Sequence, residues 1–209
     1  MSNDNLAHEG IRFQLSGEPL RRVITWQREV DLLVFRYQIE THAPAIVIYH
    51  PKLHFPQCLT EVPKPGEAVP YYGAFSQAYA FTFRPYEHGC GLKAENFCSK
   101  LGHRYPKDLP SLELELPETI QVEVSASREF WLGLGWAWWY DDPTAESVCD
   151  NITFAIDPEM YDRMVHWGWD RDRLETYTYQ FWPLSVGCEI VVRDTTTGEE
   201  ECLTKDVCW

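Results

Sequence analysis

The sequence predicts a β-rich fold, all-β or α+β, built as an antiparallel β-sandwich with two short helices and one long proline-rich loop. Three observations lead to this prediction: stretches in which apolar and polar residues alternate, turn residues between them, and an aromatic content that includes nine tryptophans. Alternation with a period of two is typical of a strand with one buried face. A chain of 209 residues can bury a substantial core. We expect a flexible tail over residues 1–10 and a single sandwich-like domain over residues 11–209.

In the first part of the chain the pattern predicts several strands, with a turn at Gly17 to Pro19. These strands are expected over residues 11–15, 22–26, 31–40, 45–49 and 78–83. In the strand over residues 31–40, alternation would bring one set of large side chains to the same face. That set is Leu33, Phe35, Tyr37 and Ile39. The run over residues 45–49 is apolar throughout, which is typical of a strand buried on both faces.

Five prolines lie between Pro51 and Pro70. Proline cannot donate to a ladder of hydrogen bonds, so we expect a long loop over residues 51–72. A rough apolar stripe over residues 92–101, followed by Gly102, predicts the first short helix. Residues 112–116 and 120–126 alternate cleanly around Pro117 and are expected as consecutive antiparallel strands. Glu113 and Glu115 would then face water.

The last part of the chain carries the clearest local signals. Asp157 followed by Pro158 predicts a helix start, because the Asp oxygen can cap the first turn and proline fits the first helical position. This second helix should run to about His166, with Met160, Met164 and Val165 inward. Strands are expected over residues 152–156, 174–182, 187–193 and 200–209. The last two would form a hairpin around Asp194–Gly198, with Gly198 at positive φ.

The stretch over residues 130–140 predicts the central strand of the fold. Its even positions are all large and apolar, whereas its odd positions form a lane of Gly133, Gly135 and Ala137 between Trp131 and Trp139. The lane allows close approach to the backbone, either by a neighbouring element of the same chain or by a ligand or partner. The candidate binding residues are Trp131, Gly133, Gly135, Trp139, Asp141, Asp142, Trp167 and Trp169.

Charge and targeting signals restrict the function classes. The net charge is −14, which excludes a protein built to bind phosphate backbones and is compatible with a partner that has a basic surface. The N-terminus carries no secretory signal, and no apolar run is long enough to span a membrane. The seven cysteines are scattered, so we expect reduced thiols and a cytoplasmic location.

Two other classes of chemistry remain open, although no cofactor is the main expectation. His88, Cys90, Cys98 and His103 provide ligand types that zinc prefers, but their spacing matches no common structural pattern. A second set, His50, His54 and Cys58, lies on the proline-rich loop. Cys90, placed just before the expected helix, could also be a nucleophile whose pKa is lowered by a helix dipole.

A third alternative is a carbohydrate or small-molecule binder or hydrolase. Tryptophans stack on sugar rings and paired carboxylates cleave glycosidic bonds, and Asp141, Asp142, Asp170 and Asp172 lie close to tryptophans in the sequence. No enzyme signature is complete. We therefore expect a non-enzymatic protein-binding domain, of an inhibitor or regulator type, that uses acidic surface and exposed Trp and Tyr; homo-oligomerisation stays open.

Overall fold

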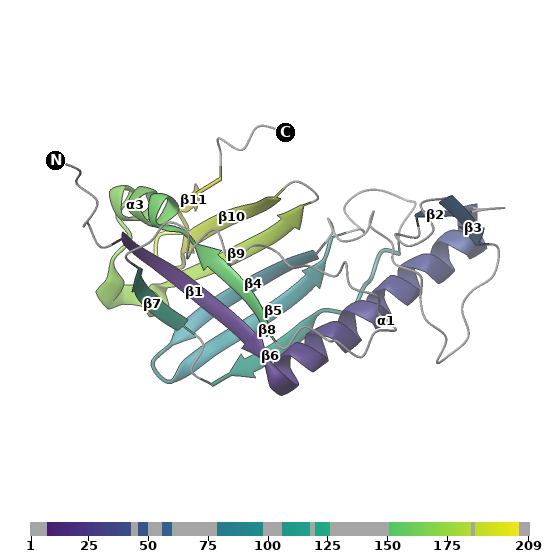
Figure 1. Ribbon diagram of the computed structural model, residues 1–209, viewed down its shortest axis with the longest axis horizontal. Helices are drawn as coiled ribbons and strands as arrows, with labels where there is room; N and C mark the ends of the chain where they lie inside the picture. The colour runs from purple at the N-terminus through teal and green to yellow at the C-terminus, as the bar shows by residue number, and fades with distance from the viewer. Residues whose placement is uncertain are drawn as a thin grey trace.

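The computed structural model describes residues 8–42, 46–49, 56–59, 79–97, 106–117, 120–125, 151–184 and 187–204. In this part of the chain the strands form a six-stranded, a three-stranded and a two-stranded antiparallel sheet. The two larger sheets pack face to face (Figure 1). The predicted β-rich, sandwich-like fold is confirmed.

The six-stranded sheet is assembled from two separate parts of the chain. Its strand order is β11-β10-β9-β4-β5-β6. The strands are β4 (Tyr79–Tyr86), β5 (Gly89–Asn96), β6 (Leu112–Leu116), β9 (Tyr177–Leu184), β10 (Gly187–Asp194) and β11 (Glu200–Cys202). Contact between β4 and β9 joins the two parts, with Phe81 opposite Phe181.

The three-stranded sheet has β1 (His8–Ser16) between β7 (Ile120–Ser125) and β8 (Asn151–Ile156). β6 and β7 were expected to pair with each other, and this expectation is wrong. β6 pairs with β5, whereas β7 pairs with β1. The chain therefore crosses from one sheet to the other after Pro117, because each strand finds its apolar partner on a different layer.

The core between the sheets is built from aromatic rings. Phe13 of β1 stacks on Phe83 of β4 with ring centroids 4.5 Å apart, and Phe154 of β8 meets Phe83 at 5.0 Å. Tyr79, Phe81 and Phe83 are all buried, as are Tyr177, Tyr179 and Phe181 of β9. The alternation predicted for these two strands is confirmed, although β9 begins at Tyr177 because residues 171–176 form the 3-10 helix η3 (Arg171–Thr176).

The largest correction concerns α1 (Gly17–His42), a helix of 26 residues where a turn and two strands were expected. It begins directly after β1, and Gly17 has a φ of 55°, a left-handed conformation that glycine adopts at no steric cost. The buried residues recur at helical spacing: Leu20, Val23, Gln27, Val30 and Val34. This stripe packs against β1, β6 and β8, and tertiary burial overrides the period-two pattern of residues 31–40.

The expected helix over residues 92–101 is also wrong in its described part, because β5 covers Gly89–Asn96. Cys90, Leu92, Ala94 and Asn96 are buried in strict alternation, which only a strand produces. The two-stranded sheet pairs β2 (Ile46–Tyr49) with β3 (Pro56–Leu59). Residues 56–59 were expected as loop. Pro56 opens the strand, a position at which proline is tolerated.

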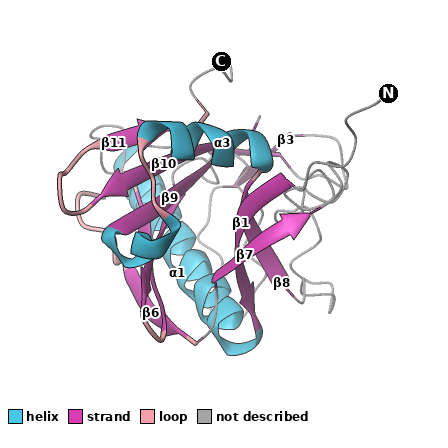
Figure 2. Ribbon diagram, turned by 90° about the vertical axis from the view of Figure 1, so that its left-hand side faces the viewer, coloured by secondary structure: helices cyan, strands magenta, loops and turns pink. Residues whose placement is uncertain are grey.

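The second predicted helix is confirmed as α3 (Pro158–Trp167). The Asp157 side chain accepts a hydrogen bond from Met160 N, and Gly168 ends the helix with a φ of 111°. Tyr161 and Met164 face the core, whereas Val165 was expected inward and is 44% exposed. In Figure 2, α3 and α1 lie at opposite ends of the space between the two sheets. None of the described helices is long and apolar enough to cross a membrane.

Candidate protein-docking surface

The six-stranded sheet has an outer face, which we define as the side of the sheet that points away from the three-stranded sheet. The three-stranded sheet and α1 lie on the other side (Figure 2). Strand alternation assigns the outer side chains, since the inner ones are buried. They are Ala80, which is 0% exposed, and Thr82, Arg84, Tyr86, Lys93, Glu95, Phe97, Glu113, Glu115, Thr178, Gln180, Trp182, Glu189, Val191, Arg193, Glu200 and Cys202.

Carboxylates outnumber cations on the outer face, and the cations near them are partly neutralised. Lys93 Nζ lies 2.9 Å from Glu95 Oε1. The hydrogen bond with Glu95 raises the pKa of Lys93, although slight burial acts in the opposite direction; the charges of Glu95 and Glu113 also raise it. On the other half of the sheet, Arg193 faces Glu200 at 3.5 Å. The remaining charge at the β6 edge is therefore negative.

Small neutral side chains occupy the middle of the outer face. Thr82 lies opposite Gln180, whose Nε2 donates to Thr82 Oγ1 over 3.4 Å, and Val191 lies beyond Gln180. Gly91 lies in the same region, between Arg84 and Glu115 in the strand register. Among the described residues, a Cβ at Gly91 would meet only Arg84 O, at 3.8 Å. The centre is therefore a low surface with charged residues around it.

Tyr86 and Glu115 form an ordered pair at the turn end of the outer face. Tyr86 lies opposite Gly89 across the tight β4–β5 turn, and its hydroxyl donates a short hydrogen bond to Glu115 Oε2. This bond raises the pKa of Tyr86, with smaller contributions from burial and from the Glu115 charge. Tyr86 remains 43% exposed. An exposed tyrosine held in one orientation is a typical anchor of a protein interface.

A second aromatic pair lies at the opposite end of the same face. The rings of Phe97 and Trp182 lie 5.1 Å apart, tilted by 38°. Both side chains are partly buried. The outer face thus has an aromatic contact at each of two ends, and aromatic residues are enriched at protein interfaces.

The structure describes only two of the predicted binding residues. Trp131, Gly133, Gly135, Trp139, Asp141 and Asp142 lie outside the described residues. Trp167 is partly buried and meets Tyr177 edge-on, with centroids 6.3 Å apart. Trp169 is 5% exposed, and its Nε1 donates to Tyr179 Oη over 2.8 Å. Trp169 therefore belongs to the core and offers no stacking surface for a sugar.

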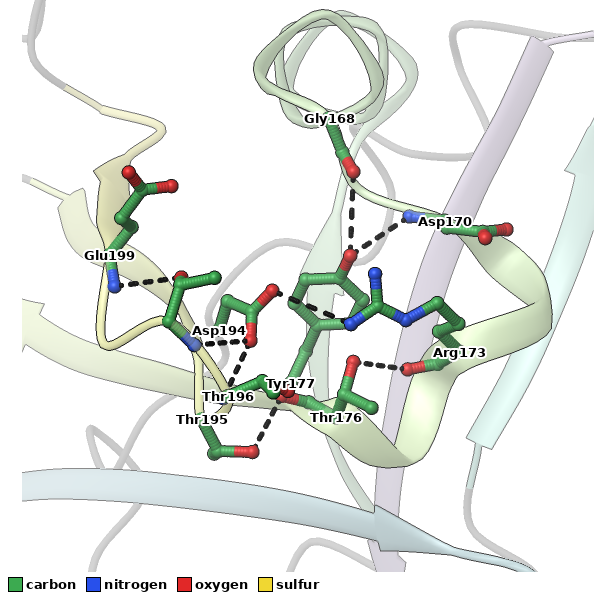
Figure 3. Close-up of polar contacts among 10 residues, drawn as sticks. Gly168, Asp170, Arg173, Thr176, Tyr177, Asp194, Thr195, Thr196 and Glu199 are labelled. Atoms are coloured by element: carbon green, nitrogen blue, oxygen red, sulfur yellow. Dashed lines mark hydrogen bonds and ion pairs between the residues drawn. The ribbon is translucent and has the colours of Figure 1, made fainter.

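The carboxylates near Trp169 have structural tasks. Asp170 caps η3, because its Oδ1 accepts a hydrogen bond from Asp172 N over 3.0 Å. Asp170 N lies 3.2 Å from the hydroxyl of Tyr177, whose oxygen accepts this bond. These contacts hold the segment between α3 and β9 (Figure 3). The carbohydrate alternative receives no support from Trp169, Asp170 and Asp172, while Asp141 and Asp142 lie outside the described residues.

The metal candidates are separated where the structure describes them. The side chain of His88 is 84% exposed at the β4–β5 turn, whereas Cys90 is 0% exposed in the core. Cys98, His103, His50 and His54 lie outside the described residues, and Cys58 lies on β3. No group of three His, Cys, Asp or Glu side chains with metal-binding geometry occurs among the residues that the structure describes. Zinc binding stays a prediction that needs the remaining residues.

The thiol-enzyme alternative loses its physical basis at Cys90. The residues after Cys90 form β5, so no helix dipole lies there to lower the pKa of the thiol. Among the described residues, Cys188 and Cys202 form no disulfide. Burial raises the pKa of the Cys188 thiol well above its ordinary value, and a buried thiol of this kind is unreactive.

The most connected polar cluster holds the β10–β11 turn in place. Asp194 Oδ1 accepts from the backbone nitrogens of Thr196 at 2.7 Å and Thr197 at 3.2 Å, and Asp194 Oδ2 lies 3.8 Å from Arg173 (Figure 3). Hydrogen bonds from these backbone groups, the one from Thr196 above all, lower the pKa of Asp194. The predicted turn is confirmed, with Gly198 at a φ of 79°. Because both carboxylate oxygens of Asp194 are engaged by these groups, the cluster stabilises the turn; we call it the Asp194 clasp.

Sequence reasoning missed Tyr86, Gly91 and Lys93 as surface residues. It ended the strand at Phe83 and expected a helix from residue 92, so it could not place these side chains on one face. The prediction that Glu113 and Glu115 face water is confirmed, since both are exposed. Extending the alternation of residues 79–83 by three positions would have placed Tyr86 beside them.

No protein-family model matches the chain, and neither the curated proteins nor the solved structures contain a significant match.

Proposed function

We propose that this chain is a non-enzymatic protein-binding domain that docks on a basic surface of a partner protein through its outer face. The observation that carries the proposal is the β4–β5–β6 ladder: a low centre at Gly91, exposed carboxylates at Glu113 and Glu115, and a fixed, exposed Tyr86. The backbone of a preorganised interface generally moves little when the partner binds.

Charge supports the choice of a basic partner. The chain carries 32 acidic against 18 basic side chains, so its field attracts cationic proteins and repels acidic ones over distances near the Debye length, about 10 Å at 0.1 M salt. Electrostatic complementarity mainly increases the association rate and selects the partner. An acidic domain that covers a basic functional site of its partner would act as an inhibitor or regulator of that partner.

The absence of disulfides among the described cysteines Cys188 and Cys202 supports a reducing compartment as the place of this interaction. Cys188 and Cys202 are free thiols in the described part of the chain, a state that reducing compartments such as the cytoplasm maintain. We place the interaction there.

A matched series at Gly91 tests the proposal. Alanine, arginine and glutamate can each be placed at this position, because the nearest atom to a new Cβ is 3.8 Å away. Partner capture from lysate of the source organism, followed by a binding titration with the captured protein, should give equal affinity for wild type and Gly91→Ala. Gly91→Arg should weaken binding by more than about tenfold, because it places a cation against a basic surface. Gly91→Glu should weaken it less.

Salt dependence and melting temperature complete the test. Affinity for the captured protein should fall as salt is raised from about 0.05 M to 0.5 M, and all three variants should melt at the wild-type temperature or above it. Equal affinity of wild type and a folded Gly91→Arg variant would show that the outer face takes no part in binding.

A further inference from the structure

We propose that Tyr86 and Glu115 form a preformed receptor for an arginine side chain of the partner. This inference rests on the proposed function, because it names the group on the basic partner that the outer face recognises. It requires a supported aromatic ring that is accessible to a partner, an anionic acceptor fixed beside that ring, and a local charge that favours a cation.

Gly89 supports one face of the Tyr86 ring. A Cβ built on Gly89 would lie 2.8 Å from Tyr86 Oη and 2.9 Å from Tyr86 Cζ. These distances are shorter than a van der Waals contact, so the phenol lies directly over the bare glycine backbone. Tyr86 is nevertheless 43% exposed, so part of its side chain is accessible to a partner. Cations bind over accessible aromatic faces, and arginine does so more often than lysine.

Glu115 supplies the acceptor. The Tyr86 hydroxyl donates to Glu115 Oε2, so the carboxylate keeps its other oxygen and its remaining lone pairs for a second donor. Glu115 is exposed. A guanidinium lying on the phenol could therefore direct an N–H group at the carboxylate in the same plane. The planar fork of arginine fits this combination of stacking and hydrogen bonding, whereas a lysine ammonium is a compact point charge.

The surrounding charges favour a cation from outside. Lys93 is engaged by Glu95 at 2.9 Å, and Glu113 adds a negative charge two residues before Glu115 on β6. Glu87 follows Tyr86 in the turn and lies 3.7 Å from His88. Arg84 is the cation on the same face of β4 as Tyr86, and it opposes a second guanidinium. Removing the Arg84 charge should therefore strengthen the binding of arginine.

Preorganisation explains why this pair suits recognition. The hydrogen bond and the glycine contact already fix the two side chains, so little conformational entropy is lost when the partner binds. Tyrosine is an efficient anchor for the same reason, because it has only two side-chain torsions for a large contact area.

The test titrates the full-length chain with short peptides, followed by NMR of protein carrying isotope-labelled tyrosine. The probes are capped tri-arginine, tri-lysine and uncharged tri-citrulline. We expect tri-arginine to bind best and to shift the Tyr86 ring resonances, assigned by their loss in Tyr86→Leu. Tyr86→Leu should weaken tri-arginine binding by about two- to fivefold and remove the preference over tri-lysine.

Conservative substitutions, which should leave the fold intact, distinguish an effect on arginine binding from an effect on folding. Glu115→Gln retains an oxygen acceptor for the Tyr86 hydroxyl but removes the charge, and it should weaken tri-arginine binding more than Glu113→Gln, the matched charge control on the same strand. Arg84→Gln should strengthen it. Equal binding of tri-arginine by wild type, Tyr86→Leu and Glu115→Gln would overturn the inference. If Tyr86→Leu fails to fold, Glu115→Gln against Glu113→Gln decides.

The same variants distinguish this inference from the proposed function. If Gly91→Arg abolishes binding of the captured partner while Tyr86→Leu and Glu115→Gln leave it unchanged, the outer face docks on the partner but the arginine receptor is wrong. If all of these variants bind the partner as wild type does, both proposals fail. If all of them weaken partner binding and the two receptor variants also lose the tri-arginine preference, both are supported.

Discussion

The indole nitrogen of Trp169 donates a hydrogen bond to the hydroxyl oxygen of Tyr179 over 2.8 Å within the core. Trp169 lies just after α3, and Tyr179 lies in the middle of β9. The Tyr161 ring of α3 packs edge-on against the same indole at 5.2 Å. The hydrogen bond between Trp169 and Tyr179 therefore attaches the end of α3 to the inner face of the six-stranded sheet.

Removing the Tyr179 hydroxyl alone should lower the free energy of unfolding by more than its share in a variant that lacks both hydrogen-bonding groups. Tyr179→Phe leaves the buried Trp169 N–H without this partner, and we expect the free energy of unfolding to fall by about 1–3 kcal/mol. Urea denaturation of Tyr179→Phe, Trp169→Phe and the double variant measures the coupling. Losses that add within about 0.5 kcal/mol in the double variant would show that the hydrogen bond contributes little.

Two neighbouring glycines of β5 should respond in opposite ways to alanine. A Cβ at Gly89 would lie 2.8 Å from the backbone oxygen of Leu116, which cannot move without disturbing β6. Gly89→Ala should therefore lower stability by about 1–3 kcal/mol. Gly91→Ala has open space and should be neutral or stabilising by up to about 1 kcal/mol, because glycine weakens a strand interior. Thermal melts of the two variants at matched concentration test this, and similar melting temperatures would contradict it.

Acid should weaken the clasp at Asp194. Its folded pKa is lowered, mainly by hydrogen bonds from Thr196 and Thr197. A lowered pKa contributes stability that is present above the unfolded value near 4 and is lost as the pH falls through the folded value. We expect Asp194→Asn, which keeps an oxygen acceptor, to show a smaller loss of stability than wild type between about pH 5 and pH 2. Parallel urea titration curves for the two proteins across this range would contradict the prediction.

High pH should lower the stability of the fold through the buried tyrosines Tyr161 and Tyr179. Burial, and then a hydrogen bond with Glu9, raise the pKa of Tyr161 to about 12, and burial also raises that of Tyr179. A phenol with a raised folded pKa contributes stability that is complete below the unfolded value near 10 and is lost as the pH rises toward the folded value. Absorbance at about 295 nm, taken as wild type minus Tyr161→Phe, should titrate near pH 12. A midpoint near pH 10 would refute the assignment.

Local signals in the sequence predicted the regular strands and α3 because those signals are short-range. The cap at Asp157, the glycine stop at Gly168 and the turn at Gly198 each depend on neighbours within a few residues. The alternation of residues 112–116 and 177–181 likewise reports burial directly. These elements have the same conformation whichever sheet they join, so their positions could be read without knowing the topology.

The helix α1 could not be recognised by the same approach. Leu33, Phe35, Tyr37 and Ile39 alternate as a strand would, yet the residues that α1 buries, from Leu20 to Val34, follow helical spacing. A polar residue, Gln27, lies within the buried stripe at 6% exposure and conceals the pattern. Contact with β1, β6 and β8 selects the helical alternative, and these contacts exist only in the assembled fold.

The sequence predicted the acidic side chains of the surface that we propose for docking, but it did not predict the aromatic residue beside them. Acidic side chains facing water and an aromatic anchor were expected, and the acidic part lies at Glu113 and Glu115 on β6. The predicted anchors were tryptophans, of which Trp169 is in the core. Tyr86 is exposed instead, at the tight turn where it lies over Gly89; this turn was missed because the predicted strand ended at Phe83 and a helix was expected from residue 92.

The pairing of β1 has a consequence for how the chain is made. β1 leaves the ribosome before its partner β7, because β7 aligns Ser125 with His8 and so follows more than one hundred residues later. At translation rates of about 5–20 residues per second, the apolar side of β1 waits on the order of ten seconds for a neighbour. α1 needs only local contacts to begin coiling and follows β1 without a linker at Gly17. During synthesis the segment of β1 and α1 therefore has to stay unaggregated until the rest of the sandwich has been made.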